Sequence, residues 1–463
     1  METERILAEY VAQTKYEDLP SEVVEATKLG LLDTIACGLA GTTAPGAAEV
    51  VALMKELGGK KESTLLFEGE KVSSPYAAFA NSTLCHARDF DDTHDRGVLH
   101  ALVNVMPAVL AVSERKGDVS GREIITACAL GVDVACRIAV AVTFGPGFEK
   151  TQPGFLRTTV CGAFGAAAGA GRALGLDAAT ILNAMGIVYS QTGGNKQCVT
   201  DGALVKRMQP AMASQGGVFA TLLAQRGVTG AAHFLEGLYG MFNLYWGGAF
   251  DRDELLGGLG TRYEVTNLSF KPYPSCRHTH GAVEAALKVV REYALNPNEV
   301  EKVKVRTAKH KFFDNVSRPF AIRGNPQVSA QFSIPYTVAA AILRKRVFLD
   351  AFEESVVRSA EFQKMASRVE VHAEHDMVPG SLGPVTVEIV TTDGRCLSSR
   401  VNDFKGHPRN PVTREETIEK FKQCAAFSNR TYGAEQVQDM IDSLLGLENL
   451  GSIRDFIARL DAK

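Results

Sequence analysis

Residues 86–100 read HARDFDDTHDRGVLH and bring four carboxylates and three imidazoles into one short segment. Neighbouring negative charges repel one another, and each is costly to remove from water unless a cation or a proton compensates it. The flanking segments, 73–85 and 101–116, are apolar at helical spacing, which is typical of buried helices. We therefore predict a charged loop between two core helices, and such a loop is a candidate active site.

Two known motifs occur inside this loop. Asp89 to Thr93 satisfies the DxDxT pattern of aspartyl-phosphate phosphatases, whose nucleophile follows a buried strand, but the residues before Asp89 favour a helix. Asp91 to Asp95 satisfies DDxxD, by which all-helical prenyl-diphosphate enzymes bind magnesium. The sequence shows neither a second acidic motif nor a basic cluster for a diphosphate. A magnesium-dependent prenyl-diphosphate enzyme therefore stays an outside alternative.

The elements around the loop change character along the chain. From residue 21 to about residue 250 the pattern is helical, and segments 121–142, 161–176 and 211–227 are rich in Ala and Gly, which favours close helix packing. Beyond residue 271, segments 300–308, 367–374 and 383–401 alternate like strands, the last with an Asp-Gly turn at 393–394. Helical patterns return after about residue 404, so the last helices could rejoin the first domain.

Composition limits the classes of function. The chain has 463 residues, 45% hydrophobic and 22% charged, which predicts a large core and two domains. A formal net charge of -3, with Lys and Arg spread out, argues against nucleic-acid binding. Nine cysteines without a CxxC pair indicate reduced thiols. Without a signal peptide or an apolar run long enough to span a bilayer, we expect a cytoplasmic protein with no membrane partner.

Five segments occur in the order and spacing of one enzyme family: DFDDTH at 89–94 with a His at position 100, and the segments 205–227, 271–286, 332–341 and 406–421. Through them nearly the whole chain resembles the MmgE/PrpD family. That family includes 2-methylcitrate dehydratase, cis-aconitate decarboxylase and iminodisuccinate epimerase, which act on small polycarboxylates without a metal or organic cofactor. The resemblance implies a mainly α fold with a helical domain, 1–267 and 405–463, an inserted α+β lid domain, 268–404, a site at their junction and a homodimer.

The resemblance also implies site residues. Asp89, Thr93 and His100 correspond to active-site positions, and Lys206 corresponds to the family's site lysine. Removing a proton from carbon next to a carboxylate leaves a charged enolate, so such a site must supply a base, hydrogen-bond donors and cations. Lys206 can pair with a carboxylate or protonate carbon, and His100 can exchange a proton near neutral pH when Asp89 orients it. We expect Asp89, His100 and Lys206 to be catalytic, Thr93 to bind substrate, and no metal.

A second cluster, CRHTH at 276–280, belongs to the lid domain. Arg277 is suited to bind a carboxylate. A site His of cis-aconitate decarboxylase corresponds to Cys276, whereas one of 2-methylcitrate dehydratase corresponds to His278. We assign catalysis to His278 and substrate binding to Cys276 and Arg277, although the resemblance does not decide which residue exchanges the proton. His280 is expected to be a core histidine bonded to backbone.

Two departures from the family concern proton donors. The dehydratase and the decarboxylase usually carry a His where this chain has Leu156, and a His after the site lysine is replaced by Gln209, which we place among the substrate-binding residues. Expelling hydroxide needs a general acid, whereas an epimerase only moves a proton between two faces of one carbon. The sequence therefore favours an epimerase resembling iminodisuccinate epimerase. The alternative is a hydro-lyase resembling 2-methylcitrate dehydratase, or a cis-aconitate decarboxylase.

Overall fold

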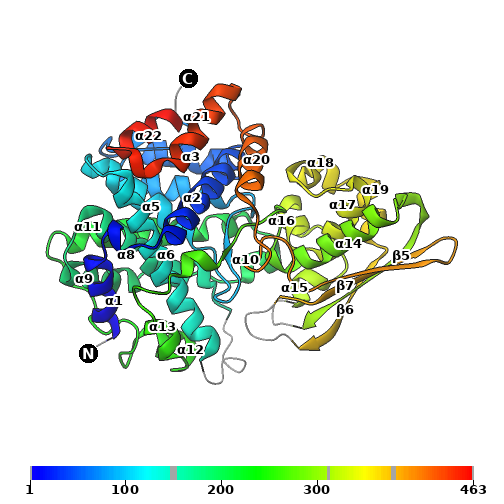
Figure 1. Ribbon diagram of the computed structural model, residues 1–463, viewed down its shortest axis with the longest axis horizontal. Helices are drawn as coiled ribbons and strands as arrows, with labels where there is room; N and C mark the ends of the chain where they lie inside the picture. Colours follow the sequence, from blue (N-terminus) through cyan, green and yellow to red (C-terminus); the bar gives the residue numbers. More distant parts are fainter. Residues whose placement is uncertain (1–2, 146–153, 310–312, 377–381, 461–463) are drawn as a thin grey trace.

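The computed structural model describes residues 3–145, 154–309, 313–376 and 382–460. Figure 1 shows two lobes, a large helical lobe that contains both ends of the chain and a smaller lobe built on a sheet. The fold is mainly α, with a large helical domain and a smaller α+β domain inserted into it, as predicted. Two hydrophobic cores follow this division: the first draws on residues 7–270, 349 and 421–460, and the second on residues 198–199 and 276–404.

The helical lobe contains most of the helices and two short strand pairs. Its longer helices are α1 (Thr3–Gln13), α2 (Ser21–Gly41), α3 (Ala47–Leu57), α4 (Ser74–His86), α5 (Leu102–Lys116), α6 (Gly121–Phe144), α8 (Arg157–Leu174), α9 (Ala178–Tyr189), α11 (Gln209–Ala224), α20 (Arg414–Ala425), α21 (Ala434–Leu445) and α22 (Ile453–Leu460). Its shorter elements are α12 (Met241–Trp246), α13 (Arg252–Leu256), β1 (Ser63–Thr64), β2 (Lys71–Val72), β3 (Thr93–His94) and β4 (Leu268–Ser269). α10 (Gln197–Asp201) lies at the junction and packs into the second core.

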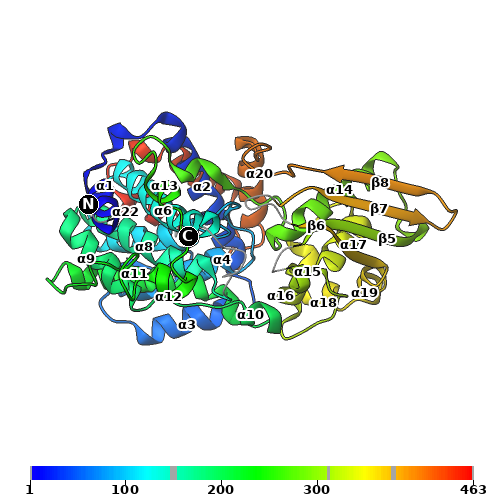
Figure 2. The ribbon, with the colours of Figure 1, turned by 90° about the horizontal axis from the view of Figure 1, so that it is seen from below.

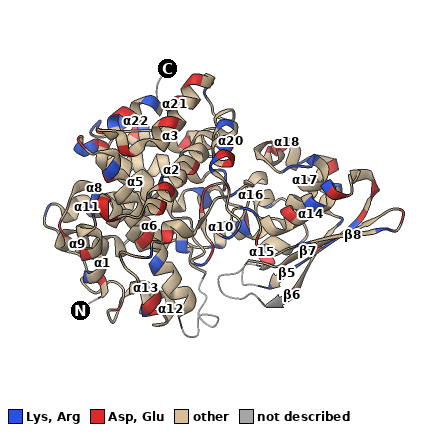
Figure 3. Cartoon of the chain, in the orientation of Figure 1, with Lys and Arg blue, Asp and Glu red and all other residues tan. Residues whose placement is uncertain are grey.

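Small residues let the central helices touch, as their composition predicts. A Cβ atom at Gly165 of α8 would lie 2.5 Å from the carbonyl oxygen of Gly131 in α6, so the two backbones are in contact there. α6 is also long and apolar enough to cross a membrane, but its apolar stretch is entirely buried within the protein. It is therefore the central helix of a folded core. Figure 3 shows acidic and basic side chains interspersed over both lobes rather than gathered by sign.

The smaller lobe packs helices on one face of a four-stranded sheet (Figure 2). The strands are β5 (Val300–Lys309), β6 (Val369–Asp376), β7 (Val385–Thr391) and β8 (Cys396–Val401), in the order β6-β5-β7-β8. β5 and β6 are parallel and the other pairs antiparallel, with the predicted Asp-Gly turn between β7 and β8. The helices of this lobe are α14 (His280–Glu292), α15 (Phe313–Ser317), α16 (Pro326–Gln331), α17 (Ile334–Arg344), α18 (Glu354–Val357) and α19 (Ala360–Ala366).

The junction of the lobes is held by contacts between distant segments. β3, inside the acidic loop, pairs antiparallel with β4, which leads into the small lobe. α20 returns the chain to the helical lobe, and its Lys420 donates hydrogen bonds to Asp33 Oδ1 (2.7 Å) and to the carbonyl oxygens of Phe90 (2.7 Å) and Lys271 (3.1 Å). One ammonium group thus ties α2, the acidic loop and the segment after β4 together.

Candidate active site

The acidic loop runs from the end of α4 to the start of α5 and is buried. Asp89, Asp91, Asp92 and Asp95 are each at most 6% exposed, so the loop is not a solvated surface turn. The prediction of a charged loop between two core helices is confirmed. Asp89 has a φ angle of 50°, a left-handed conformation that is uncommon for residues other than Gly and often marks functional sites.

Asp89 is surrounded by cations from two different segments. Lys206, in a short 3₁₀ turn before α11, donates to Asp89 Oδ1 at 2.5 Å, and Lys271, just after β4, lies 3.5 Å from the same oxygen. Lys271 also donates to the backbone oxygen of Asp89 at 2.8 Å. Burial opposes the charge of Asp89, but Lys206 and then Lys271 hold its pKa well below the usual range. Asp89 is therefore an anion at neutral pH.

Asp91 lies behind Asp89, between two imidazoles. His86 Nδ1 is 2.9 Å from Asp91 Oδ2, and His100 Nδ1 is 2.8 Å from the same oxygen, although the second contact is too oblique for a good hydrogen bond. The two rings stand edge to face with their centres 4.7 Å apart. Burial opposes the charge of Asp91, yet the two imidazoles hold its pKa well below the usual range. Asp91 thus orients both rings.

The backbone of His100 is held on both sides. Its N–H donates to Thr158 Oγ1 at 3.1 Å, and its carbonyl oxygen accepts from Asn104 Nδ2 at 2.7 Å. Its Nε2 lies 4.0 Å from Asp89 Oδ1. The ring therefore presents Nε2 beside the Asp89–Lys206 pair.

The remaining two carboxylates of the loop have separate partners. Asp92 Oδ2 accepts from the N–H of Ala101 at 3.1 Å, at the start of α5. Burial, and then the charge of Asp91, raise the pKa of Asp92 to about 8. Asp95 pairs with Arg277 at 3.2 Å and accepts from Ser269 at 2.8 Å. The DDxxD carboxylates thus diverge, which argues against the diphosphate motif.

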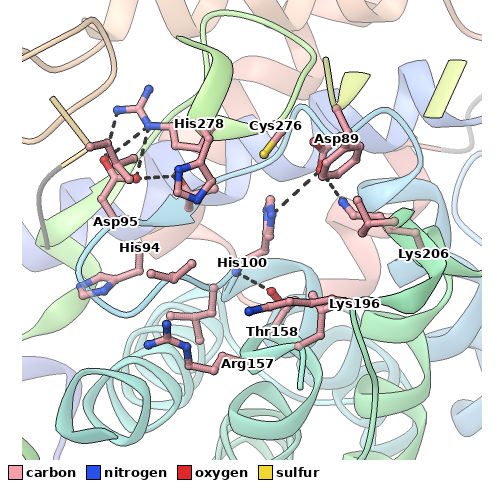
Figure 4. Close-up of a pocket in the computed structure, with 18 of the residues that line it drawn as sticks. Asp89, His94, Asp95, His100, Arg157, Thr158, Lys196, Lys206, Cys276 and His278 are labelled. Carbon is pink, nitrogen blue, oxygen red and sulfur yellow. Dashed lines mark hydrogen bonds and ion pairs between the residues drawn. The ribbon is translucent and has the colours of Figure 1, made fainter. Parts of the chain in front are cut away.

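A cavity lies between the loop and the small lobe (Figure 4). Its volume is about 120 Å³, which suits a small molecule better than a long-chain substrate. Seven of the eight site residues expected from the sequence line it: Asp89, Thr93, His100, Lys206, Cys276, Arg277 and His278. Segments from both lobes therefore meet at this cavity.

The cavity walls differ in character. Among the described residues, four Lys and Arg side chains line it (Arg157, Lys196, Lys206 and Arg277), against two carboxylates, Asp89 and Asp95. Each of those carboxylates is already paired with a cation. Other parts of the wall are apolar: Val98, Leu99, Phe155, Leu156, Val199, Phe332 and Leu382. A cavity lined by both cationic and apolar side chains suits a small substrate with several carboxylates.

The residues of segment 276–280, from the small lobe, differ in their contacts. Arg277 contacts Asp95 and also donates to the carbonyl oxygen of Lys405 at 3.0 Å. Burial, and then the charge of Asp89, raise the pKa of the Cys276 thiol to about 12, so this thiol is neutral at pH 7. His280 is buried and its Nε2 lies 3.1 Å from the carbonyl oxygen of Ser275, which confirms the expected core histidine. Figure 4 shows Cys276 beside Asp89, above His100, and His278 beside Asp95.

The two departures from the family occupy different places. Leu156 lines the cavity just before α8, as part of its apolar wall. Gln209 does not line it: its Oε1 accepts from Asn195 N at 2.7 Å and its Nε2 donates to Asn195 O at 2.9 Å. Gln209 is buried, and these two bonds hold the segment before α10. Its expected contact with substrate is thus not present in this geometry.

Four clustered side chains could in principle hold a metal ion. One nitrogen or oxygen from each of His86, Asp89, Asp91 and His100 lies within 4.8 Å of the others. However, Lys206 Nζ already lies 2.9 Å from His86 Nε2 and 2.5 Å from Asp89 Oδ1. A divalent ion at the same place would be repelled by this ammonium group. The cluster therefore fits a cation supplied by the chain better than a bound metal.

Several residues of the site were not found from the sequence. His86, Asp91 and Lys271 act behind the cavity, and Arg157 and Lys196 line it. Arg88 and Arg96, the arginines nearest to Asp91 in the sequence, contact Thr43 and Glu254 instead. Lys271 is the first residue of segment 271–286, one of the five segments that resemble the MmgE/PrpD family. That position was the sequence signal that could have identified it as a site residue.

Comparison with known proteins bears on this site. The family model described as the MmgE/PrpD N-terminal domain matches residues 5–253, and that of the MmgE/PrpD C-terminal domain matches residues 273–445. The chain belongs to the MmgE/PrpD family. As a member of the MmgE/PrpD family it is an enzyme, a lyase or an isomerase.

Relatives of this MmgE/PrpD enzyme match along almost their full length. The cis-aconitate decarboxylase-like protein oryM of Aspergillus oryzae is 26% identical over 479 residues, which cover 99% of this chain and 97% of the relative. Cis-aconitate decarboxylase of Aspergillus terreus is 26% identical over 464 residues (95% and 93%). Cis-aconitate decarboxylase of Homo sapiens is 25% identical over 448 residues (94% and 90%). These names favour the lyase alternative over the epimerase that the sequence favoured.

Proposed function

We propose that this enzyme is a cofactor-independent decarboxylase of a small unsaturated polycarboxylate, with cis-aconitate as the first substrate to test. The observation that carries the proposal is the match along nearly the full length to proteins named cis-aconitate decarboxylase. The cavity supports the same substrate class, because it is small and has more cationic than anionic side chains.

Decarboxylation needs a proton donor and cations beside the retained carboxylates, and the cavity offers both. The bond to one carboxylate breaks, its electron pair forms a new C=C bond, and the displaced π pair takes a proton at the carbon next to another carboxylate. Lys206 and His100 are the candidate proton donors for that carbon, and the donor regains its proton from water after product release. Cations beside the retained carboxylates stabilise the charge that develops on them.

The apolar wall bears on which group leaves. A carboxylate placed against Leu156 is destabilised by desolvation, whereas neutral carbon dioxide is not. Loss of hydroxide would require an acid where this chain has leucine. The residue that argued against a dehydratase is therefore compatible with a decarboxylase.

Three substrates given to the purified enzyme test the proposal. With cis-aconitate in deuterated water, we expect carbon dioxide release and one solvent deuterium fixed in the product for each turnover. Ultraviolet absorbance would report alkene formation from 2-methylcitrate, and NMR would report deuterium exchange into iminodisuccinate. Turnover of either of these two without carbon dioxide release from cis-aconitate would replace the proposal with a hydro-lyase or an epimerase. The Lys206→Ala variant controls for a contaminating activity.

A further inference from the structure

His86 is fully buried, does not line the cavity, and still contacts the site lysine. Its Nε2 lies 2.9 Å from Lys206 Nζ, and its Nδ1 lies 2.9 Å from Asp91 Oδ2. An ammonium group can only donate, so Nε2 of His86 must accept. The proton of a neutral His86 then resides on Nδ1 and is donated to Asp91.

The protonation state of His86 agrees with these contacts. Burial lowers its pKa to about 4, and the Lys206 charge acts in the same direction while Asp91 opposes it. His86 is therefore neutral at pH 7, which leaves a lone pair on Nε2 for Lys206. A protonated His86 would turn a donor toward the ammonium group and break the contact.

The same carboxylate reaches the second proton-exchange group. Asp91 Oδ2 also lies 2.8 Å from His100 Nδ1, while His100 Nε2 is on the side of Asp89. One buried anion thus lies against both imidazoles, one of which holds Lys206 and the other of which lines the cavity. Among the described residues, Asp89 and His86 accept from two of the three N–H groups of Lys206, and the Phe332 ring of the cavity wall lies 5.0 Å from Nζ. The third N–H group is therefore available to a substrate in the cavity.

We propose that His86 and Asp91 are positioning residues for the reaction, a buried pair that sets the direction of the free Lys206 N–H and the tautomer of His100. The inference rests on the proposed function only where its test measures turnover of a substrate. His86 contributes hydrogen bonds and no proton of its own. Its role should therefore survive in a side chain that donates to Asp91 and accepts from Lys206 without being basic.

Glutamine is such a side chain and leucine is not. His86→Gln offers an amide N–H to Asp91 and a carbonyl oxygen to Lys206, and should keep kcat within about fivefold of wild type. His86→Leu loses both bonds, and we expect kcat to fall by about a hundredfold with KM changed less than about threefold. His372→Gln, at an exposed position on β6, is the surface control, and thermal unfolding checks that each variant folds.

Two kinetic results would overturn the proposal: equal damage from Gln and Leu, or full activity in folded His86→Leu. If the Leu variant does not fold, Asp91→Ala replaces it, because it removes the oxygen that both imidazoles contact. The substrate used is whichever of the three the wild type turns over.

A substrate-free measurement separates this inference from the proposed function. Histidine labelled with ¹⁵N should show His86 neutral, with its proton on Nδ1, at pH 7. It should also show the Nδ1–H form of His100 lost in Asp91→Ala, where no acceptor remains beside Nδ1. A charged His86, or a proton on its Nε2, would refute the positioning role even if cis-aconitate is the correct substrate.

Discussion

The charges of the site are arranged so that each buried anion has a cation or an imidazole of its own. Lys206 and Lys271 form ion pairs with Asp89, and Arg277 forms one with Asp95. The imidazoles of His86 and His100 contact Asp91. Removing one partner therefore leaves the other charge in a poorly solvated place, which explains why single substitutions here should be severe.

Lys206 and His100 are expected to act on the substrate directly. Lys206→Ala and His100→Asn should each lower kcat by about a hundredfold or more, because each removes a group that transfers a proton or stabilises charge. Lys271 still lies 3.5 Å from Asp89, so Lys206→Ala should fold. Steady-state kinetics beside an exposed control, Lys302→Ala, check this. A change confined to KM would reduce either residue to a binding group.

Asp92 should make stability depend on pH. Its pKa is raised to about 8 in the folded protein, above its ordinary value, so the folded state holds this proton more tightly than the unfolded state. Its contribution to stability is complete in acid and is lost as pH rises toward 8, after which it is constant. Asp92→Asn keeps an acceptor for Ala101 and removes the titration. Urea unfolding from pH 5 to pH 9 should show the variant gaining stability relative to wild type as pH rises; parallel curves would contradict this.

At the level of elements, close contacts between helices fix the position of α8, which begins next to the acidic loop. α6 and α8 touch through Gly131 and Gly165, and α8 begins at the cavity with Arg157 and Thr158. β3 and β4 pair across the domain junction, and α20 closes the same region through Lys420. A small displacement of α8 would therefore also move the wall that contacts His100.

Gly165→Ala tests this packing. The new Cβ would lie 2.5 Å from the carbonyl oxygen of Gly131, and the helices must separate, which costs about 1–3 kcal/mol and outweighs the helix propensity gained. Gly216→Ala in α11 is the matched control, because its nearest neighbour is the end of the flexible Gln191 side chain at 3.2 Å. Chemical unfolding should separate the two variants. Equal stabilities would mean that the contact is readily relaxed.

For the whole molecule, the cavity between the two lobes is lined by residues from Asp89 to Leu382, so both lobes must be folded to form it. Large apolar side chains also remain exposed on the helical lobe, at Met212 and Phe219 of α11 and at Leu238, Tyr239 and Leu244 near α12. Exposed apolar groups of this kind are compatible with a subunit contact.

The homodimer implied by the family resemblance is the prediction at this scale. Light scattering at micromolar concentration should give twice the chain mass of 49.8 kDa. A monomer with full activity would remove the prediction.

Metal independence is a second prediction for the intact enzyme. Because Lys206 lies among His86 and Asp89 as a built-in cation, prolonged treatment with a chelator should leave turnover unchanged. Activity lost on chelation and restored by magnesium would return attention to the DDxxD carboxylates.

Local sequence patterns were enough to predict the main helices, the sheet strands, the Asp-Gly turn and the buried loop. This is because periodicity and turn chemistry depend on only a few neighbouring residues. The order of the family motifs was enough to name Asp89, His100 and Lys206 as candidate catalytic residues. The pattern could not show that His86 holds Lys206, 120 positions away, or that Gln209 turns to the backbone of Asn195. Side-chain direction and pairing between distant segments depend on how α4, α11 and the segment after β4 pack together. The partners of each charge were therefore decided only by the tertiary structure, because a buried carboxylate stays ionised only beside a cation or imidazole that the fold brings to it, and Asp92, which has neither, has a raised pKa instead.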